Sequence, residues 1–324
     1  MRAPTQAQLV SMLRGHGYHF RTFNFSVEDP CRAEDVDWNY KDIVHPHFVH
    51  PHMRRCYAFA DADGYSCIDI QRPFGFQVAQ SVSTWVSGPN RLTTMTVSFF
   101  LIIIIEVVFE PIAELRSRTT TTYQIGSTWR LLLAAAVPVL QWALRRNWDE
   151  FWRDDHRMRV RRGELRQQGF DFAKPPRIHG IASTLKISDN NVVPPAVPCT
   201  HPVTRIDLAP RDGRVVYVGT SDHFGLQVAL HPDRLEIYPR LCPHEGACLD
   251  TPRAPAQGMV RCPWHGRSFP PVATLSYAEA PTTVVGPLHR FVLTESELRI
   301  EPLGETSAAG VPDWTGSRAP MAAT

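Results

Sequence analysis

The chain has 324 residues, of which 43% are hydrophobic and 20% charged, and its formal net charge is +2. That length suits two domains better than one, and the near-neutral charge gives no reason to expect nucleic acid or an anionic membrane as a partner. The seven cysteines are an odd number spread over a long chain, and the first residues, "MRAPTQAQLVSML", lack the charged start and apolar core of a signal peptide. These features predict a reducing, cytoplasmic setting.

The first thirty or so residues show no strong periodicity and predict no element. The stretch "KDIVHPHFVHPH" follows, in which Asp42, His45 and His50 stand as D-x2-H-x4-H. Two histidines and a carboxylate on one face of an iron leave its remaining positions open for oxygen and substrate. The alternative is a surface loop rich in histidine, in which His47 and His52 repeat the H-x4-H step. Asp42 favours the first pair, because no aspartate stands three residues before the second.

A strand-rich region extends from Arg55 to about Tyr123. Its short runs of Val, Ile, Phe, Thr and Tyr are broken by the turn signals "DADG", "QRPFG" and "SGPN", which predicts an antiparallel sheet. Within it, "VSFFLIIIIEVVF" (97–109) is too short to cross a membrane as a helix and carries Glu106. Its β-branched content predicts a buried strand instead, and no transmembrane segment is expected.

The composition changes from about Ser127 to Gly169, where Ala, Leu, Arg and Glu are abundant. This predicts a long helix with Gly169 as its C-terminal stop. Pro138 lies in its apolar first half and predicts a kink. A sheet followed by one long helix indicates an α+β fold.

One acidic residue of this helix continues its apolar stripe. The stripe is marked by Trp148, Phe151 and Trp152. Asp155 follows them at i+7, i+4 and i+3, so it points toward the core. Burying an ionised carboxylate costs several kcal/mol unless a metal ion or a partner such as Arg159 compensates it. Asp154 is rotated by roughly 100° toward solvent and is the second choice for a metal ligand.

Prolines crowd the aperiodic stretch from Asp171 to Asp212, which predicts a boundary between two domains. Short strand-like runs such as "RVVYVGT", "FGLQVAL" and "DRLEIYPRL" follow it and predict an all-β unit. We expect a first domain at 1–172, a linker at 173–202, the all-β domain at 203–303 and a disordered tail at 304–324.

Two loops of the all-β region each hold one cysteine and one histidine. These are "LCPHEGACLD", with Cys242 and His244, and "RCPWHGRSF", with Cys262 and His265. Zinc fingers pair cysteine with cysteine and histidine with histidine, whereas each loop here is mixed. A [2Fe-2S] cluster whose second iron takes two histidines needs one thiolate and one imidazole from each of two facing loops. The pattern favours that cluster over zinc, with Gly246 and Gly266 letting the backbone approach the inorganic core.

With the signature "CPHEGA…CPWHG", residues 203–303 resemble a Rieske domain. The resemblance implies that Cys242 and Cys262 hold one iron, and that His244 and His265 hold the other. The disulfide that clamps the two loops in respiratory-type Rieske proteins has no counterpart, because Trp264 stands where one of its cysteines would be. Cys248 is therefore expected to be a small buried residue, and the domain resembles the oxygenase and ferredoxin type.

The D-x2-H-x4-H motif likewise resembles the iron motif of the Rieske non-heme oxygenases. The resemblance implies that His45 and His50 bind a mononuclear Fe(II) and that Asp42 bridges to the cluster. In that family the third ligand lies in the comparable long helix, often within a doubled aspartate, which agrees with Asp155, and with Asp154 as the reserve. The sheet and long helix resemble the helix-grip, START-like catalytic domain of these enzymes.

The resemblance implies a mono- or dioxygenase that uses O2 to hydroxylate or desaturate an apolar small molecule. Electrons would come from NAD(P)H through a separate reductase, with or without a ferredoxin, and the assembly would be a homotrimer. Phe99, Phe100 and Phe109 are expected to face either the core or a substrate cavity. The order of the two domains is the reverse of that in familiar members. The alternative is a Rieske ferredoxin-like electron carrier fused to a helix-grip domain that binds a lipid or another ligand.

Overall fold

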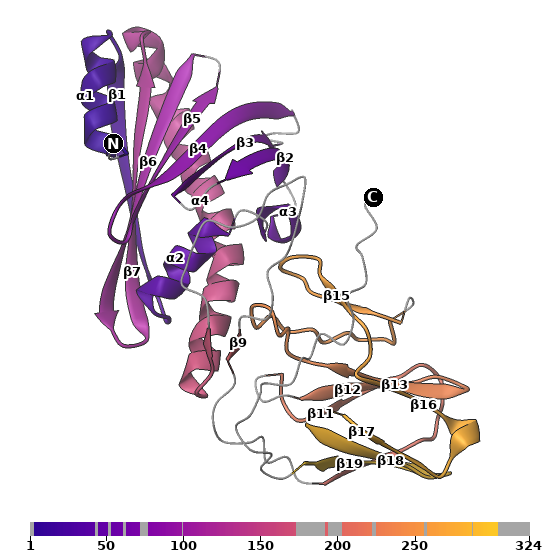
Figure 1. The fold of residues 1–324 in the computed structure, drawn as a ribbon. Coiled ribbons are helices and arrows are strands. Elements are labelled where there is room, and N and C mark those ends of the chain that lie inside the picture. Colours follow the sequence, from indigo (N-terminus) through magenta and orange to yellow (C-terminus); the bar gives the residue numbers. More distant parts are fainter. Residues whose placement is uncertain are drawn as a thin grey trace. The chain divides into compact units, whose positions relative to one another are not determined.

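A computed structural model gives the fold of the chain (Figure 1). It describes residues 3–42, 45–50, 53–60, 63–71, 77–98, 100–172, 192–193, 203–221, 225–255, 258–286 and 288–303. Most of the expected linker and all of the expected tail lie outside these residues. The described residues form two compact units, and the division falls inside one helix, with Gly163 in the first unit and Glu164 in the second.

The first unit is built on a seven-stranded antiparallel sheet, in the order β1-β7-β6-β5-β4-β3-β2. Its strands are β1 (His19–Asp29), β2 (Met53–Ala60), β3 (Gly64–Gln71), β4 (Val78–Gly88), β5 (Arg91–Ser98), β6 (Leu101–Ala113) and β7 (Arg116–Ser127). Its helices are α1 (Gln6–Gly15), α2 (Ala33–Lys41), α3 (His45–Val49) and most of α4 (Arg130–Gln167). This sheet with one long helix after it confirms the predicted α+β, helix-grip arrangement.

The two faces of the sheet pack against different helices, because side chains alternate across each strand. On β6, Ile104 packs with Leu9 of α1, whereas Phe109 packs with Val36 of α2. Helix α4 is on the α2 face, where Trp148 stacks on Phe25 of β1 with ring centroids 5.3 Å apart. The strand register places Phe25 on the same face as Phe109, through β7.

Helix α4 ends as the sequence predicts. Gly169 has a φ of 86°, and the amide of Phe170 donates to the carbonyl of Leu165 at 3.0 Å, which is a glycine C-cap. Pro138 lies inside the helix. Within the described residues, no helix combines the length and the apolar composition that crossing a membrane requires.

The apolar run 97–109 is not one strand, contrary to the prediction. Ser98 of β5 pairs with Leu101 of β6 across a tight turn, so the run is divided between two strands. Phe100, in the turn, is 43% exposed and stacks on Trp129 instead of facing the core or a cavity. Phe109 is 1% exposed and belongs to the core, and Phe99 lies outside the described residues.

Strand β1 is an element that the sequence analysis missed. It pairs with β7 along its whole length, from His19 opposite Ser127 to Asp29 opposite Ser117. The alternation of Phe23, Phe25 and Val27 with polar residues is the period-2 signal that could have revealed it.

The described part of the second unit is all-β apart from the end of α4 and a short 3-10 helix. Two four-stranded sheets have the orders β10-β19-β18-β17 and β11-β12-β13-β16, and two small sheets pair β14 with β15 and β8 with β9. The strands are β8 (Asp171–Phe172), β9 (Val192–Val193), β10 (Thr204–Asp207), β11 (Val215–Val218), β12 (Leu226–Leu230), β13 (Arg234–Pro239), β14 (Val260–Arg261), β15 (Ser268–Phe269), β16 (Ala273–Ser276), β17 (Thr282–Val285), β18 (His289–Leu293) and β19 (Glu297–Pro302). Leu165, in the last turn of α4, packs with Phe170, Phe172 and Leu241.

Candidate functional site

The two Cys/His loops of the second unit follow β13 and β14, and each forms the same type of backbone turn. The amide of Gly246 donates to the carbonyl of Cys242 at 2.9 Å, and Gly266 repeats this bond to Cys262 at 2.9 Å. Gly246 has a φ of 83° and Gly266 a φ of 66°, in a region that other residues rarely adopt. The turn itself therefore requires the two glycines, which is a more direct reason than the predicted approach to an inorganic core.

The four predicted cluster ligands are brought together and buried, with exposures of 0% for Cys242, 1% for Cys262, 1% for His244 and 2% for His265. The two imidazole rings have their centroids 4.8 Å apart and are nearly perpendicular. Burial raises the pKa of the Cys242 thiol well above its usual range, while the hydrogen bond with Cys242 lowers the pKa of Cys262. Two thiols and two imidazoles, buried side by side, are the donor set that a mixed-ligand [2Fe-2S] cluster needs.

Two further residues of the first loop differ from expectation. Cys248 is half-buried, where a small buried residue was predicted. Glu245 was not singled out, yet it is 2% exposed and its Oε1 lies 3.7 Å from Nε2 of His244. The loop also packs closely on α4, since a Cβ on Gly246 would come within 2.5 Å of Cδ1 of Leu165.

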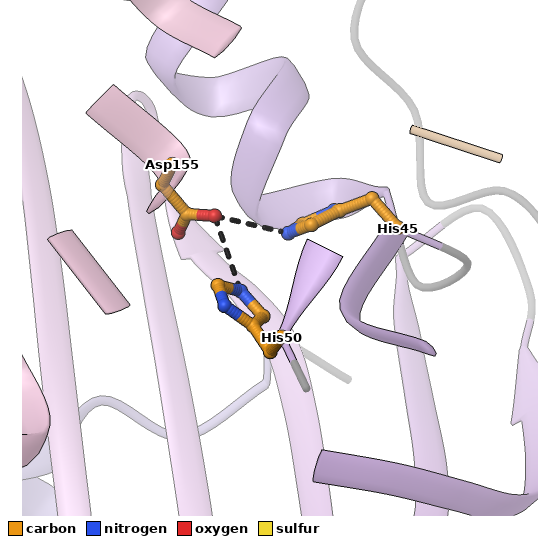
Figure 2. A group of neighbouring side chains, drawn as sticks. All are labelled: His45, His50 and Asp155. Carbon is orange, nitrogen blue, oxygen red and sulfur yellow. Dashed lines mark ion pairs between the residues drawn. The ribbon is translucent and has the colours of Figure 1, made fainter. Parts of the chain in front are cut away.

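In the first unit, the three predicted mononuclear-iron ligands converge (Figure 2). His45 begins α3 and His50 follows its last residue, Val49. Nε2 of each histidine is 3.2 Å from the same oxygen, Oδ1 of Asp155 on α4. The three donor atoms lie within 4.8 Å of one another. Oδ1 of Asp155 is buried yet forms no hydrogen bond within the described residues. Two imidazole nitrogens and an oxygen that meet without bonding one another fit a metal ion with an incomplete set of protein ligands.

A second carboxylate lies against the other ring nitrogen of each histidine. Nδ1 of His45 is 3.6 Å from Oδ2 of Asp42, and Nδ1 of His50 is 3.5 Å from Oδ2 of Asp154. Asp42 also accepts the backbone amide of His45 at 3.3 Å. Outer carboxylates of this kind fix the orientation of metal-binding histidines. The sequence analysis expected Asp154 to point away from the trio toward solvent. Its side chain is 32% exposed but contacts His50 of the trio.

The electrostatics of the trio favour a cation. Burial opposes the charging of His45, but the close, negatively charged carboxylates of Asp155 and Asp42 outweigh it and raise the pKa of His45 to about 9. Burial would likewise raise the pKa of Asp155, but the two imidazoles lower it well below its usual range. Asp155 is thus kept ionised by two imidazole rings that both contact its Oδ1. The side chain of His47 and all of His52 lie outside the described residues.

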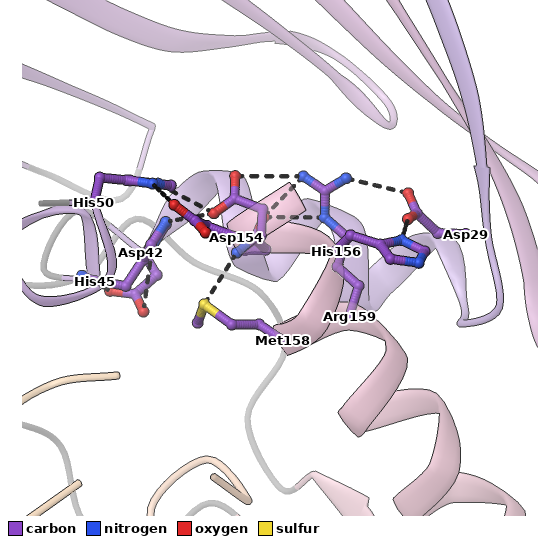
Figure 3. A network of polar contacts seen from close by, with 10 residues as sticks. Asp29, Asp42, His45, His50, Asp154, His156, Met158 and Arg159 are labelled. Atoms are coloured by element: carbon purple, nitrogen blue, oxygen red, sulfur yellow. Dashed lines mark hydrogen bonds and ion pairs between the residues drawn. The ribbon is translucent and has the colours of Figure 1, made fainter. Parts of the chain in front are cut away.

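Arg159, the alternative partner for Asp155, contacts its other oxygen. Nη2 of Arg159 is 3.7 Å from Oδ2 of Asp155, so Asp155 faces the histidines with one oxygen and the guanidinium with the other. Arg159 is 1% exposed and also donates to Asn39 at 2.8 Å and to Asp29 at 3.1 Å. Asp29 in turn bonds His156 at 2.7 Å, as Figure 3 shows. The sequence analysis missed Asp29 and His156, which are far apart in the chain.

Comparison with known sequences supports the predicted Rieske domain in the second unit. Residues 204–290 match the Rieske [2Fe-2S] domain family. Among curated proteins, no sequence matches the chain.

Several solved structures resemble the chain. The Zhui aromatase/cyclase from Streptomyces sp. R1128 has 11% identity and a TM-score of 0.40, over 44% of this chain and 96% of that one. A START superfamily protein from Mycobacterium smegmatis has 12% identity and a TM-score of 0.30, over 40% and 98%. A norcoclaurine synthase mutant from Thalictrum flavum, in complex with a transition-state analogue, has 8% identity and a TM-score of 0.38, over 44% and 96%.

Proposed function

Because residues 204–290 match the Rieske [2Fe-2S] domain, we propose that the chain is a Rieske-type non-heme iron oxygenase. It hydroxylates or desaturates a small, mainly apolar molecule with O2, using electrons that a separate NAD(P)H-dependent reductase supplies, with or without a ferredoxin. The observation that supports this proposal most is the convergence of His45, His50 and Asp155 in a second site with metal-ligand chemistry. A cytoplasmic homotrimer is part of the same proposal.

In this proposal, Cys242, His244, Cys262 and His265 hold the [2Fe-2S] cluster, which passes electrons one at a time. His45, His50 and Asp155 hold the mononuclear Fe(II), which supplies the activation of O2 when it is bound. Three protein ligands leave coordination positions open, and the protein's part is to fix that ligand geometry.

The surrounding residues have distinct parts in the proposal. Asp42 and Asp154 hold the imidazoles of His45 and His50 in place through their outer nitrogens. Arg159 contacts the second oxygen of Asp155, which would leave the first oxygen, the one that faces the two histidines, to hold the metal ion. Asp42 is also the proposed bridge to the cluster.

The other candidate is an electron carrier whose first unit binds a ligand without oxygen chemistry. The iron content of the purified full chain separates the two, because a [2Fe-2S] cluster contributes two irons and the trio contributes one more. Iron near the sum of both supports the oxygenase, and iron at the cluster value alone supports the carrier.

His45→Ala and Asp155→Ala variants provide the sharper test. Each should retain the visible absorption of the cluster, lose about one iron per chain, and lose substrate-dependent O2 uptake. His231→Ala is a matched control, because His231 pairs with Glu236 in the other unit and should leave the iron content unchanged. Full iron content in both trio variants would exclude this metal site.

A further inference from the structure

The outer face of α4 is apolar along the first half of the helix. Leu131 is 86% exposed, Val139 62% and Trp142 51%. Their spacing of i, i+8 and i+11 places them within about 80° of one another around the helix. Leu133, which is buried, is on the opposite side, about 160° from Leu131. The three exposed side chains therefore point away from the side of α4 that packs on the first unit.

Other exposed apolar residues adjoin these three. Pro138 lies on the same face of the helix and is exposed. Just before the helix, Trp129 is exposed and stacks on the exposed Phe100 of the β5–β6 turn, with ring centroids 5.7 Å apart. Single exposed hydrophobic residues are ordinary, but a contiguous group of them marks a surface that binds a protein or a membrane. We call this group the apolar patch, and it comprises Phe100, Trp129, Leu131, Pro138, Val139 and Trp142.

Basic residues border the apolar patch at both ends of the helical face. Arg130 stands at its start, and Arg145 and Arg146 stand one turn beyond its end; all three are exposed. The guanidinium of Arg146 lies 5.8 Å from the centre of the Trp142 ring. From residue 115 to residue 148 the sequence contains five arginines and no Asp or Glu. The net charge of +2 is thus unevenly distributed, and this surface is basic although the whole chain is nearly neutral.

Ion pairs neutralise some of these arginines but not all. Two of them share Glu28, and Arg146 pairs with Glu150. The charges of Arg130 and Arg145 are not neutralised by an ion pair within the described residues. These two arginines therefore add an attraction for anions to the apolar patch.

The charge of this surface distinguishes a lipid partner from a second copy of the chain. A twofold axis would bring the same patch of two copies together. Since both ends of the patch are basic, either orientation would place arginines beside arginines, and like charges across an interface are unfavourable. An anionic lipid surface suits both features, because apolar side chains enter the headgroup boundary and arginines are attracted to the phosphates. Tryptophan, present here at both ends of the patch, is typical of residues at membrane interfaces.

We propose that the first half of α4 docks the chain on the surface of an anionic lipid bilayer. The helix lies along the surface, with the apolar patch in the boundary between headgroups and acyl chains, and with Arg130 and Arg145 at the lipid phosphates. This inference goes beyond the proposed function and uses none of the metal-binding residues. It can therefore fail while the oxygenase proposal stands, and the reverse.

Co-sedimentation of the purified full chain with lipid vesicles tests the proposal. One set of vesicles is phosphatidylcholine alone, and the other contains about one-third phosphatidylglycerol, which is anionic. The chain should bind the anionic vesicles about 25-fold more tightly, because Arg130 and Arg145 each contribute about fivefold near an anionic surface. Added salt should weaken the binding, since it screens these charges.

Two variants test the apolar and the basic parts separately. Val139→Glu should weaken binding to the anionic vesicles by about tenfold or more, because it removes apolar area and adds a repelled charge. Val285→Glu is the matched control, since Val285 is also 62% exposed but belongs to the other unit, and it should bind like the wild type. Arg145→Gln should weaken binding about fivefold, whereas Arg253→Gln, at an exposed arginine of the second unit, should have no effect.

Absence of binding to the anionic vesicles overturns the proposal, as does equal binding to both kinds of vesicle. Equal effects of Val139→Glu and Val285→Glu would also overturn it. Sedimentation velocity without lipid covers the other occupant. A dimer that is lost only in Val139→Glu, together with no vesicle binding, would identify a second copy as the partner of the apolar patch.

Discussion

Nδ1 of His50 lies 3.5 Å from Oδ2 of Asp154, on the other side of the ring from Asp155. The adjacent aspartates of α4, Asp154 and Asp155, thus contact the two nitrogens of one imidazole, although they are about 100° apart around the helix. In a metal site, the outer member orients the ligand without binding the metal itself.

Asp154→Asn should therefore weaken the binding of iron to the trio by about 10–100-fold without abolishing it, because the ring loses an orienting charge but keeps its Nε2. Competition with a metal chelator measures this affinity. Asp149→Asn is the control, as Asp149 is an exposed acid of the same helix. An Asp154→Asn protein with wild-type affinity, or one as deficient as Asp155→Ala, would contradict the assignment of Asp154 as an orienting residue.

The raised pKa of His45 predicts how the metal-free protein responds to pH. The folded-state pKa is about 9 against an ordinary value of 6.5, so the protonated ring stabilises the metal-free fold. That contribution is complete below pH 6.5 and is lost as the pH rises through 9. Denaturant unfolding of metal-free protein should show a fall in stability across this window, and the fall should be smaller in His45→Gln.

The same proton competes with the metal ion, because a histidine ligand must be neutral. Iron affinity should therefore increase as the pH rises toward 9, opposite in sign to the stability of the metal-free fold. Metal titrations at several pH values measure this. An affinity independent of pH in that range would mean that His45 is not a ligand.

Gly163 and Gly15 offer a matched pair of substitutions in helices. A Cβ on Gly163 would lie 2.0 Å from the carbonyl oxygen of Pro30, which is backbone, whereas a Cβ on Gly15 meets nothing within 4 Å. Gly163→Ala should destabilise the protein by about 1–3 kcal/mol, as overpacking does. Gly15→Ala should be neutral or stabilising by up to about 1 kcal/mol. Chemical denaturation compares the two, and equal effects would refute the close approach of α4 to Pro30.

Arg159→Met should be among the most destabilising substitutions in the chain. It leaves the buried carboxylate of Asp29 without its guanidinium, and breaking such a pair costs about 3–5 kcal/mol. Arg146→Met is the control on the same helix, since its pair with Glu150 is exposed and contributes about 0.5 kcal/mol or less. Urea unfolding of both variants distinguishes these cases, and a small effect for Arg159→Met would indicate that its charge is not needed.

The sequence predicted which side chains converge better than it predicted what surrounds them. Helical periodicity identified Asp155 as the inward acid because a stripe of aromatic residues is a local signal. It could not reveal that Asp154 reaches His50, since that contact depends on where α3 lies against α4. The pair of Asp29 and His156 joins residues 127 positions apart, and no pattern along the chain records such a pair.

Strand boundaries show the same limit. No Gly or Pro stands between Ser98 of β5 and Leu101 of β6, so the apolar run 97–109 carries no turn signal that local rules recognise. Only the pairing of Ser98 with Leu101 locates it. By contrast, Gly169 ends α4 at the predicted position because a helix C-cap is specified locally.

The packing of Leu165 against Gly246 determines where the chain can be truncated to produce the second unit alone. A protein fragment that starts at residue 203 would contain all four predicted cluster ligands but lack Leu165, Phe170 and Phe172, which fill the small core around Leu241. Such a fragment would leave an apolar hollow directly beneath the first Cys/His loop. The end of α4 thus supports the first Cys/His loop by packing against it. Truncation after α4 would reduce the stability of the loop that contains His244.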